Sequence, residues 1–366
     1  ANNMTILGTS SAVPVWIVQL GAMTINSTAI GGSIAVTGNY IGNPGANAGI
    51  YQTGTITGAS GSSISFTSNN NINQGGALIL AANTSGIAAD ITYDVTTGNK
   101  TSSVLAGALS VPSVSTSAIN YIVKTAGSAI NPAAIGTSLL PLPGYVLLDN
   151  TYGCGTAGCT PVSGYINTNT TTANLIAQAT TSAGVTINDA IYARGNITVN
   201  GASSSNAIDY SQPIISTAGS VFLNGGTTTV RGVYESAATT IAGNNITIIG
   251  TSTGVPTWAT QIGALTINSS SIGGSITVTG NYIGNPGNTG GIYQAGIITG
   301  ASGTNISFIS NNNISQNGAI NLVANTSGAA ANITYDVTTG NKTSSILAGA
   351  LSIPAGSTSA INYIIK

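Results

Sequence analysis

The feature that most constrains this chain is a long internal repeat. Residues 4–124 recur as residues 246–366 without insertion or deletion, at a constant offset from position 4 to position 246. Most aligned positions are identical. We therefore divide the chain into a first copy of block A (1–124), a block B (125–245) and a second copy of block A (246–366). Together they are predicted to form one continuous rod.

Block B shares a weaker pattern with block A. The tripeptide TIN at 24–26 precedes the alternating segment 32–38, and TIN at 186–188 precedes the similar segment 195–201. The separations from Ile25 to Ile187 and from Ile187 to Ile267 both lie close to multiples of about 20 residues, a length within the range of solenoid repeats. This spacing predicts a solenoid with coils of about 20 residues.

Short segments with a period of two predict strands. SIAV at 33–36, SISF at 63–66 and NITV at 196–199 alternate small or polar residues with apolar ones, and Gly or Asn follows soon after. No segment has the period of an amphipathic helix. We therefore expect an all-β parallel β-helix with Ile34 and Ile64 in its core and Asn and Thr at its corners. The alternative is a tandem array of β-sandwich or barrel domains.

The segment TITGASGSSISFTSNNNINQGGALILAANTSG at 55–86 resembles the repeat regions of filamentous-haemagglutinin-like exoproteins of two-partner secretion. The resemblance covers both copies of block A and parts of block B. It implies a right-handed β-helix, secretion across a bacterial outer membrane, and a role in adhesion or cell contact at the bacterial surface.

The near absence of charge excludes several partners. Only 4% of the residues are charged, the net charge is −1 and the chain has no His. The six Lys and Arg residues are far apart, whereas nucleic acids and anionic membrane surfaces require clusters of them. No apolar run reaches the roughly 18 residues of a membrane-spanning helix. We therefore expect neither a nucleic-acid partner nor a membrane span in this segment.

The same composition argues against an enzyme. Acid–base catalysis requires paired groups, and the nearest carboxylate pair, Asp90 and Asp94, is Asn332 and Asp336 in the second copy. Without His, a Ser-His-Asp or Cys-His arrangement cannot form. Calcium-binding Gly-Gly-x-Gly-x-Asp repeats are absent and the chain has two Cys. We therefore predict no catalytic, cofactor or metal site.

Three local features have weaker interpretations. Cys154 and Cys159 lie in a predicted loop excursion near residues 140–165 and are expected to form a disulfide in an extracellular setting. The repeated segment Asp94–Lys100 is either a ligand-binding turn or, as we favour, a turn with a surface ion pair. Asn-x-Ser/Thr sequons could carry sugars, although hydrogen-bonded Asn ladders between coils are favoured; these sequons include Asn26, Asn83, Asn99, Asn196, Asn268 and Asn325.

Two functional hypotheses follow. The first is a structural segment of an extracellular fibre whose partner is itself, through axial continuation or lateral association. Residues 2–8 match 244–250, and Lys366 matches Lys124, so we expect the array to continue beyond both ends. The alternative is an adhesin whose solenoid face binds cell-surface glycans at repeated weak sites. Its candidate recognition residues are Tyr40, Tyr51, Tyr93, Tyr282, Tyr293 and Tyr335.

Overall fold

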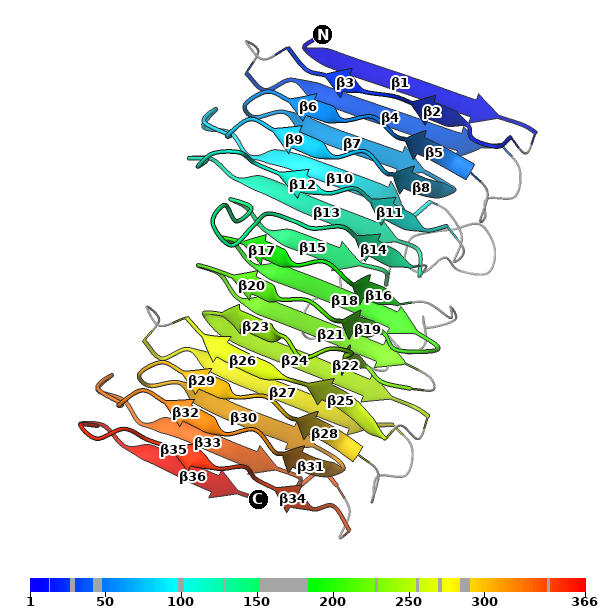
Figure 1. Ribbon diagram of the computed structural model, residues 1–366. Coiled ribbons are helices and arrows are strands. Elements are labelled where there is room, and N and C mark those ends of the chain that lie inside the picture. The colour runs from blue at the N-terminus through cyan, green and yellow to red at the C-terminus, as the bar shows by residue number, and fades with distance from the viewer. Residues whose placement is uncertain are drawn as a thin grey trace. The chain divides into compact units, whose positions relative to one another are not determined.

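The computed structural model contains only β-strands as regular elements among the residues that it describes. The described residues are 1–12, 14–26, 30–41, 48–97, 102–127, 129–151, 184–227, 230–254, 257–268, 272–283, 290–340 and 343–366. They fall into two compact units, unit 1 up to residue 200 and unit 2 from residue 201 onward. In each unit, the strands lie in successive stacked layers (Figure 1).

Unit 1 consists of stacked coils with three sides, and most coils contribute one strand to each side. The first sheet contains β1 (Asn3–Ser10), β4 (Ser33–Tyr40), β7 (Ser63–Ser68), β10 (Ala89–Val95), β13 (Ile119–Thr125), β15 (Val146–Asp149) and β18 (Ile197–Ser203, of which the residues up to Asn200 belong to unit 1). The second contains β2 (Val18–Leu20), β5 (Ala48–Gln52), β8 (Asn71–Gln74), β11 (Val104–Ala106), β14 (Ile130–Pro132) and β16 (Val185–Ile187). The third side holds β3 (Met23–Thr24), β6 (Ile56–Gly58), β9 (Leu78–Leu80), β12 (Leu109–Ser110) and β17 (Ile191–Ala193).

Unit 2 repeats this plan. Its first sheet contains β21 (Val221–Thr227), β24 (Asn245–Ser252), β27 (Ser275–Tyr282), β30 (Asn305–Ser310), β33 (Ala331–Asp336) and β36 (Ile361–Ile365). The second contains β19 (Ile208–Tyr210), β22 (Val233–Glu235), β25 (Trp258–Ile262), β28 (Gly290–Gln294), β31 (Asn313–Gln316) and β34 (Ile346–Leu347). The third contains β20 (Ile214–Ser216), β23 (Thr240–Gly243), β26 (Ala264–Ile267), β29 (Ile298–Gly300), β32 (Ile320–Leu322) and β35 (Leu351–Ser352).

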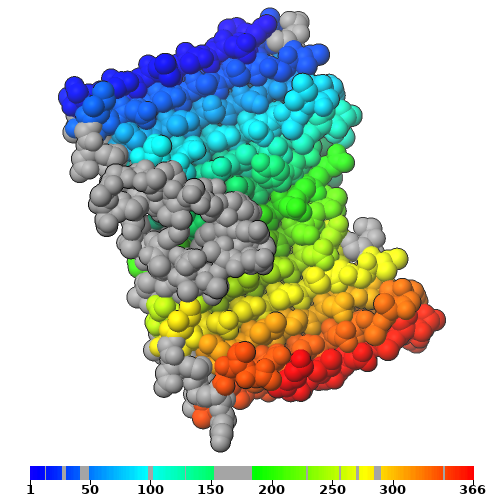
Figure 2. Space-filling view, turned by 180° about the vertical axis from the view of Figure 1, so that it is seen from behind, coloured from blue at the N-terminus to red at the C-terminus, as the bar shows by residue number. Residues whose placement is uncertain are grey.

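Within each unit, neighbouring strands pair in parallel, as for β4 with β7 and for β27 with β30. The chain is thus a right-handed parallel β-helix, as predicted, and the parallel pairing excludes the β-sandwich alternative. In the space-filling view, the coils of each unit form successive bands of colour (Figure 2). The two copies of block A form the same strands, since β4 and β27 start and end at equivalent positions. One continuous rod remains a prediction.

The predicted coil length of about 20 residues is wrong. Ile34 lies opposite Ile64, and Ile64 lies opposite Ile91, so each of these coils is longer than predicted and the second is shorter than the first. The TIN match between the blocks caused the error, because Ile187 ends a strand of the second sheet whereas Ile267 ends a strand of the third. The other match, between segments 32–38 and 195–201, is structurally sound: both lie on strands of the first sheet.

The core consists of columns of apolar side chains that share one register position. Ile34 is 1% exposed and Ile64 is fully buried, as expected from the alternation. The next column carries aromatic rings: Phe66 stacks on Tyr93 with ring centroids 5.3 Å apart, and Phe308 stacks on Tyr335 at 5.2 Å. Burial of each such side chain stabilises the fold by about 1.5–3 kcal/mol.

Amide side chains satisfy the backbone at the corners, as predicted for Asn. The Asn83 amide is buried and donates to the carbonyl oxygens of Ile87 (2.8 Å) and Ala118 (2.7 Å), the latter one coil away. At another corner, a Cβ on Gly76 would lie 1.9 Å from the Gly54 carbonyl oxygen, so only glycine fits. These contacts fix the path of the chain between sheets.

The alternation in β7 yields a direct test of the core. Ile64→Asp would place a carboxylate in the apolar column and should lower the free energy of unfolding by more than about 4 kcal/mol. Ser65→Asp, one residue along and facing outward, should change it by less than about 0.5 kcal/mol. Thermal melting followed by circular dichroism measures both. Equal melting temperatures for Ile64→Asp and the parent would contradict the core assignment.

Candidate functional site

The structure divides the six candidate recognition tyrosines into three kinds. Tyr93 and Tyr335 are fully buried, so their assignment to a recognition surface is wrong. Each donates its hydroxyl to a buried glutamine, Tyr93 to Gln74 at 2.8 Å and Tyr335 to Gln316 at 2.9 Å. The alternation Ile91-x-Tyr93-x-Val95 in the sequence already indicates an inward position.

Tyr40 and Tyr282 are half-buried at the ends of β4 and β27. Their backbone groups are held by an asparagine from the next coil: Asn69 accepts from the Tyr40 amide and donates to its carbonyl oxygen, both at 2.9 Å. Asn311 does the same for Tyr282. These hydrogen bonds tie the backbone of both tyrosines to the next coil, at the corner where the first sheet ends.

Tyr51 and Tyr293 are half-buried, and the ring of each lies against a tryptophan, stacked in the first pair and tilted in the second. The Trp16 and Tyr51 ring centroids lie 4.9 Å apart at an interplanar angle of 18°. In unit 2, Trp258 and Tyr293 are 5.4 Å apart at 34°. We call these the aromatic pairs. The sequence analysis missed the tryptophans, although the spacing Trp-x-x-Gln recurs at 16–19 and 258–261.

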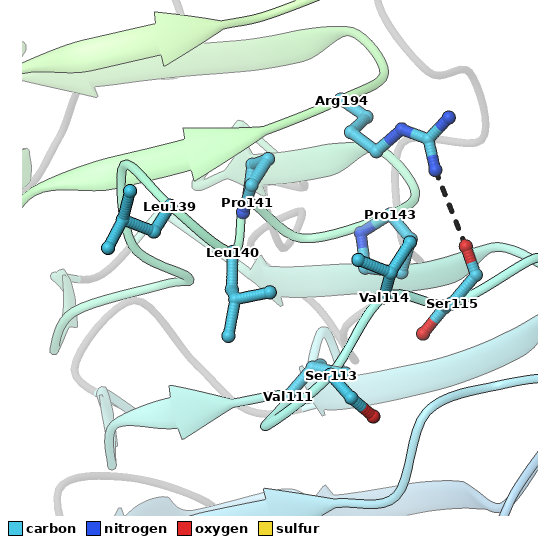
Figure 3. A pocket seen from close by; sticks show the side chains of 9 residues that line it. All are labelled: Val111, Ser113, Val114, Ser115, Leu139, Leu140, Pro141, Pro143 and Arg194. Atoms are coloured by element: carbon cyan, nitrogen blue, oxygen red, sulfur yellow. Dashed lines mark hydrogen bonds between the residues drawn. The ribbon is translucent and has the colours of Figure 1, made fainter.

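A separate pocket of unit 1 has mostly apolar walls (Figure 3). Its lining residues are Val111, Ser113, Val114, Ser115, Leu139, Leu140, Pro141, Pro143 and Arg194. The guanidinium of Arg194 donates to the Ser115 carbonyl oxygen at 3.4 Å, and the side chain of Leu139 is 89% exposed. A turn closed by the Thr137 amide and the Leu140 carbonyl oxygen shapes one wall. The described part of the predicted excursion near residues 140–165 thus adds an apolar recess to the solenoid.

A carboxylate lies beside a shallow groove in unit 2. Glu235 accepts a hydrogen bond from the Thr239 amide at 2.8 Å and faces small residues, including Gly263 and Gly296. Burial raises the pKa of Glu235, and burial together with the charge of Glu235 raises the pKa of Tyr210 well above its usual value. No second carboxylate lines the described part of this groove.

Asp149 is a buried carboxylate in unit 1. It accepts hydrogen bonds from the amide (2.8 Å) and hydroxyl (2.5 Å) of Thr151 and from the Asn200 amide group (3.0 Å). Burial raises the pKa of Asp149, while these hydrogen bonds and the charge of Lys124 act in the opposite direction. These contacts hold the Asp149 carboxylate in place between neighbouring strands of the first sheet.

The carboxylates of the first copy of block A have structural partners. Asp90 accepts from the Asn120 amide at 2.8 Å, and its replacement Asn332 accepts from Asn362 at 2.9 Å, so the ladder needs no charge. Asp94 accepts from the hydroxyl of Thr96 at 2.6 Å. Within the described ranges, no group of three or more His, Cys, Asp or Glu side chains is placed to hold a metal ion.

The other predicted features can be compared with the structure only where their residues are described. Cys154, Cys159, Asn99 and Lys100 lie outside the described residues. The sequon asparagines Asn83 and Asn325 are fully buried, so neither amide can carry a sugar in the folded protein. Asn26 and Asn196 are exposed, and Asn268 is half-buried. No helix in the described part of the chain has the length and apolar character to cross a membrane.

The raised pKa of Asp149 predicts a pH dependence of stability. The folded protein holds this proton more tightly than the unfolded chain does. The stabilisation is therefore complete below the unfolded pKa, about 3.9, and is lost as the pH rises through the folded pKa. In Asp149→Asn this loss should vanish. The new amide can also donate to the otherwise unpaired oxygen of Asn200, which should stabilise the variant by about 1 kcal/mol at neutral pH.

Urea unfolding between pH 3 and 8 measures this effect, with Asp90→Asn as the control because the second copy already carries Asn at that position. The control should keep the pH slope of the parent. A pH slope for Asp149→Asn equal to that of the parent would show that Asp149 does not cause it.

Comparisons with known proteins identify no relative. No protein-family model matches the chain, and neither the curated proteins nor the solved structures contain a significant match. Any function must therefore be argued from the fold and the surface.

Proposed function

We propose that the chain is a structural segment of an extracellular fibre, such as the shaft of a surface appendage for adhesion or cell–cell contact. The observation that carries the proposal is the repetition of whole coils. The second copy of block A places its strands where the first copy does, as β7 and β30 illustrate. A solenoid lengthens by adding coils without any change in its cross-section, so repetition of this kind extends a shaft.

The surface chemistry supports the same proposal. The outward ladders of the first sheet are built mostly from neutral amides and hydroxyls, such as Asn3 with Ser33 (3.1 Å) and Asn332 with Asn362 (2.9 Å). Because such surfaces carry few charges, little electrostatic repulsion opposes their axial continuation or lateral association. An ion pair between Lys366 and Asp336, at 3.5 Å in unit 2, neutralises two of the few charges that the chain carries.

A structural role also accounts for the ionisable groups better than catalysis does. Asp90 and Asp94 accept hydrogen bonds from neighbouring coil and turn residues, and Asp149 is buried. Acid–base chemistry would require two such groups facing one cavity. We therefore assign the chain a structural function at the bacterial surface, as the sequence resemblance also implies.

Immuno-electron microscopy of the producing cells tests this assignment. Antibodies raised against residues 1–366 should label filaments outside the cell, with gold particles recurring along each filament. A control antibody against a cytoplasmic protein should not label these filaments. Label confined to the cell interior, or to discrete particles without axial continuation, would contradict the proposal.

A further inference from the structure

The two aromatic pairs form equivalent surface features in units 1 and 2. Trp16 precedes β2 and Tyr51 lies on β5, whereas Trp258 begins β25 and Tyr293 lies on β28. All four rings are half-buried. We propose that each pair is a binding platform for the pyranose rings of a neutral polysaccharide.

The differences between the two copies point to a role for the rings beyond packing. Around the tryptophan, Ile17 corresponds to Ala259 and the buried Val18 to the buried Thr260, yet Trp and the following Gln are unchanged. If the indole served only to pack against its surroundings, it should vary as its neighbours in the chain do. Here Ile17 and Val18 have changed, as has the exposed Val15, which is Thr257 in the second copy, whereas Trp and Gln are unchanged.

Each pair has a polar neighbour suited to a sugar. Gln19 is exposed and lies opposite Tyr51 in the strand register, and Gln261 lies opposite Tyr293 in the same way. A pyranose presents C–H groups on its face and hydroxyls around its edge. An aromatic surface can pack against the face, while an amide can donate to one hydroxyl and accept from another.

The row of outward residues beside the first pair is uncharged. In unit 1, Tyr51 lies between Gln19 and Asn73, and Leu105 follows Asn73. Anionic sugars and nucleic acids are bound through Lys and Arg, so the row beside the first pair favours a neutral ligand. In unit 2, the corresponding row runs from Gln261 to Tyr234 and Asp209, and Arg231 lies over the Tyr234 ring.

A proline-rich peptide fits the pairs less well. Such peptides insert proline rings into grooves between aromatic side chains. The rings of Trp16 and Tyr51 are stacked on each other at 4.9 Å, which leaves no space for a third ring between them. A sugar ring, in contrast, can pack against the part of the aromatic surface that remains exposed. Repetition along an array would then multiply the weak affinity of each platform.

The two tryptophans also provide the assay, because Trp16 and Trp258 are the only ones in the chain. Intrinsic tryptophan fluorescence therefore reports on the two platforms alone. We would titrate the 366-residue protein with soluble hydroxyethyl cellulose, galactomannan and xyloglucan, and measure its mobility in gels containing each polymer. At least one polymer should both change the emission spectrum and retard the protein.

Variants separate recognition from folding. The double variant Trp16→Ala/Trp258→Ala should weaken retardation about tenfold, whereas Trp16→Tyr/Trp258→Tyr should retain most of it. Gln19→Ala/Gln261→Ala, which leaves the rings in place, should weaken it about threefold. The matched control Tyr40→Ala/Tyr282→Ala removes two repeated tyrosines outside the pairs and should bind like the parent. Thermal melting confirms that each variant is folded.

Three results would overturn the proposal: retardation by none of the three polymers, equal retardation of the parent and the folded Trp→Ala double variant, or stronger fluorescence changes with a polyproline peptide than with any polymer. The inference is independent of the fibre proposal. Filaments without polysaccharide binding would refute the platforms alone, and binding by a protein that forms no filaments would refute the fibre alone.

Discussion

The parallel, in-register pairing of successive coils is the constraint on which the rest of the structure depends. A single coil cannot bury its apolar face, so each coil is stable only against its neighbours. Register alignment places Ile34 against Ile64 and Ile64 against Ile91. It also stacks the rings of Phe66 and Tyr93 in the core and aligns the Asn and Ser side chains that link the coils outside it. Backbone pairing and side-chain columns therefore support the same geometry.

The sequence predicted those properties that depend on local period. Alternation identified Ile34 and Ile64 as core residues, and the long repeat identified stacked coils. The coil length was not predictable from spacing, because corner loops differ in length and the step from Ile34 to Ile64 is longer than the step from Ile64 to Ile91. The TIN tripeptides matched by composition but occupy different sheets. Local period determines which side a residue faces, whereas loop length determines where the next coil begins.

The candidate surface was predicted less well than the core. Tyr93 was assigned to the surface as a repeated tyrosine, although its alternation with Ile91 and Val95 places it inside. Tyr51 was identified without Trp16, because the two residues are distant in sequence and meet only when β2 and β5 pair. The buried carboxylate of Asp149 had no sequence signal, since its burial depends on the coils around it. Contacts between coils require the register, which a single sequence does not supply.

The measurement that tests this account most directly is the spacing between positions 35 and 65. Ala35 and Ser65 face outward in the same register on adjacent coils, which places their Cα atoms about 4.8 Å apart. Nitroxide labels on Ala35→Cys and Ser65→Cys, with Cys154 and Cys159 replaced by Ser, should show strong dipolar broadening in continuous-wave EPR. Labels on Ala35→Cys and Thr55→Cys, which a coil of about 20 residues would bring together, should show much less. Strong broadening for 35 with 55 and none for 35 with 65 would contradict the stacking of coils in this register.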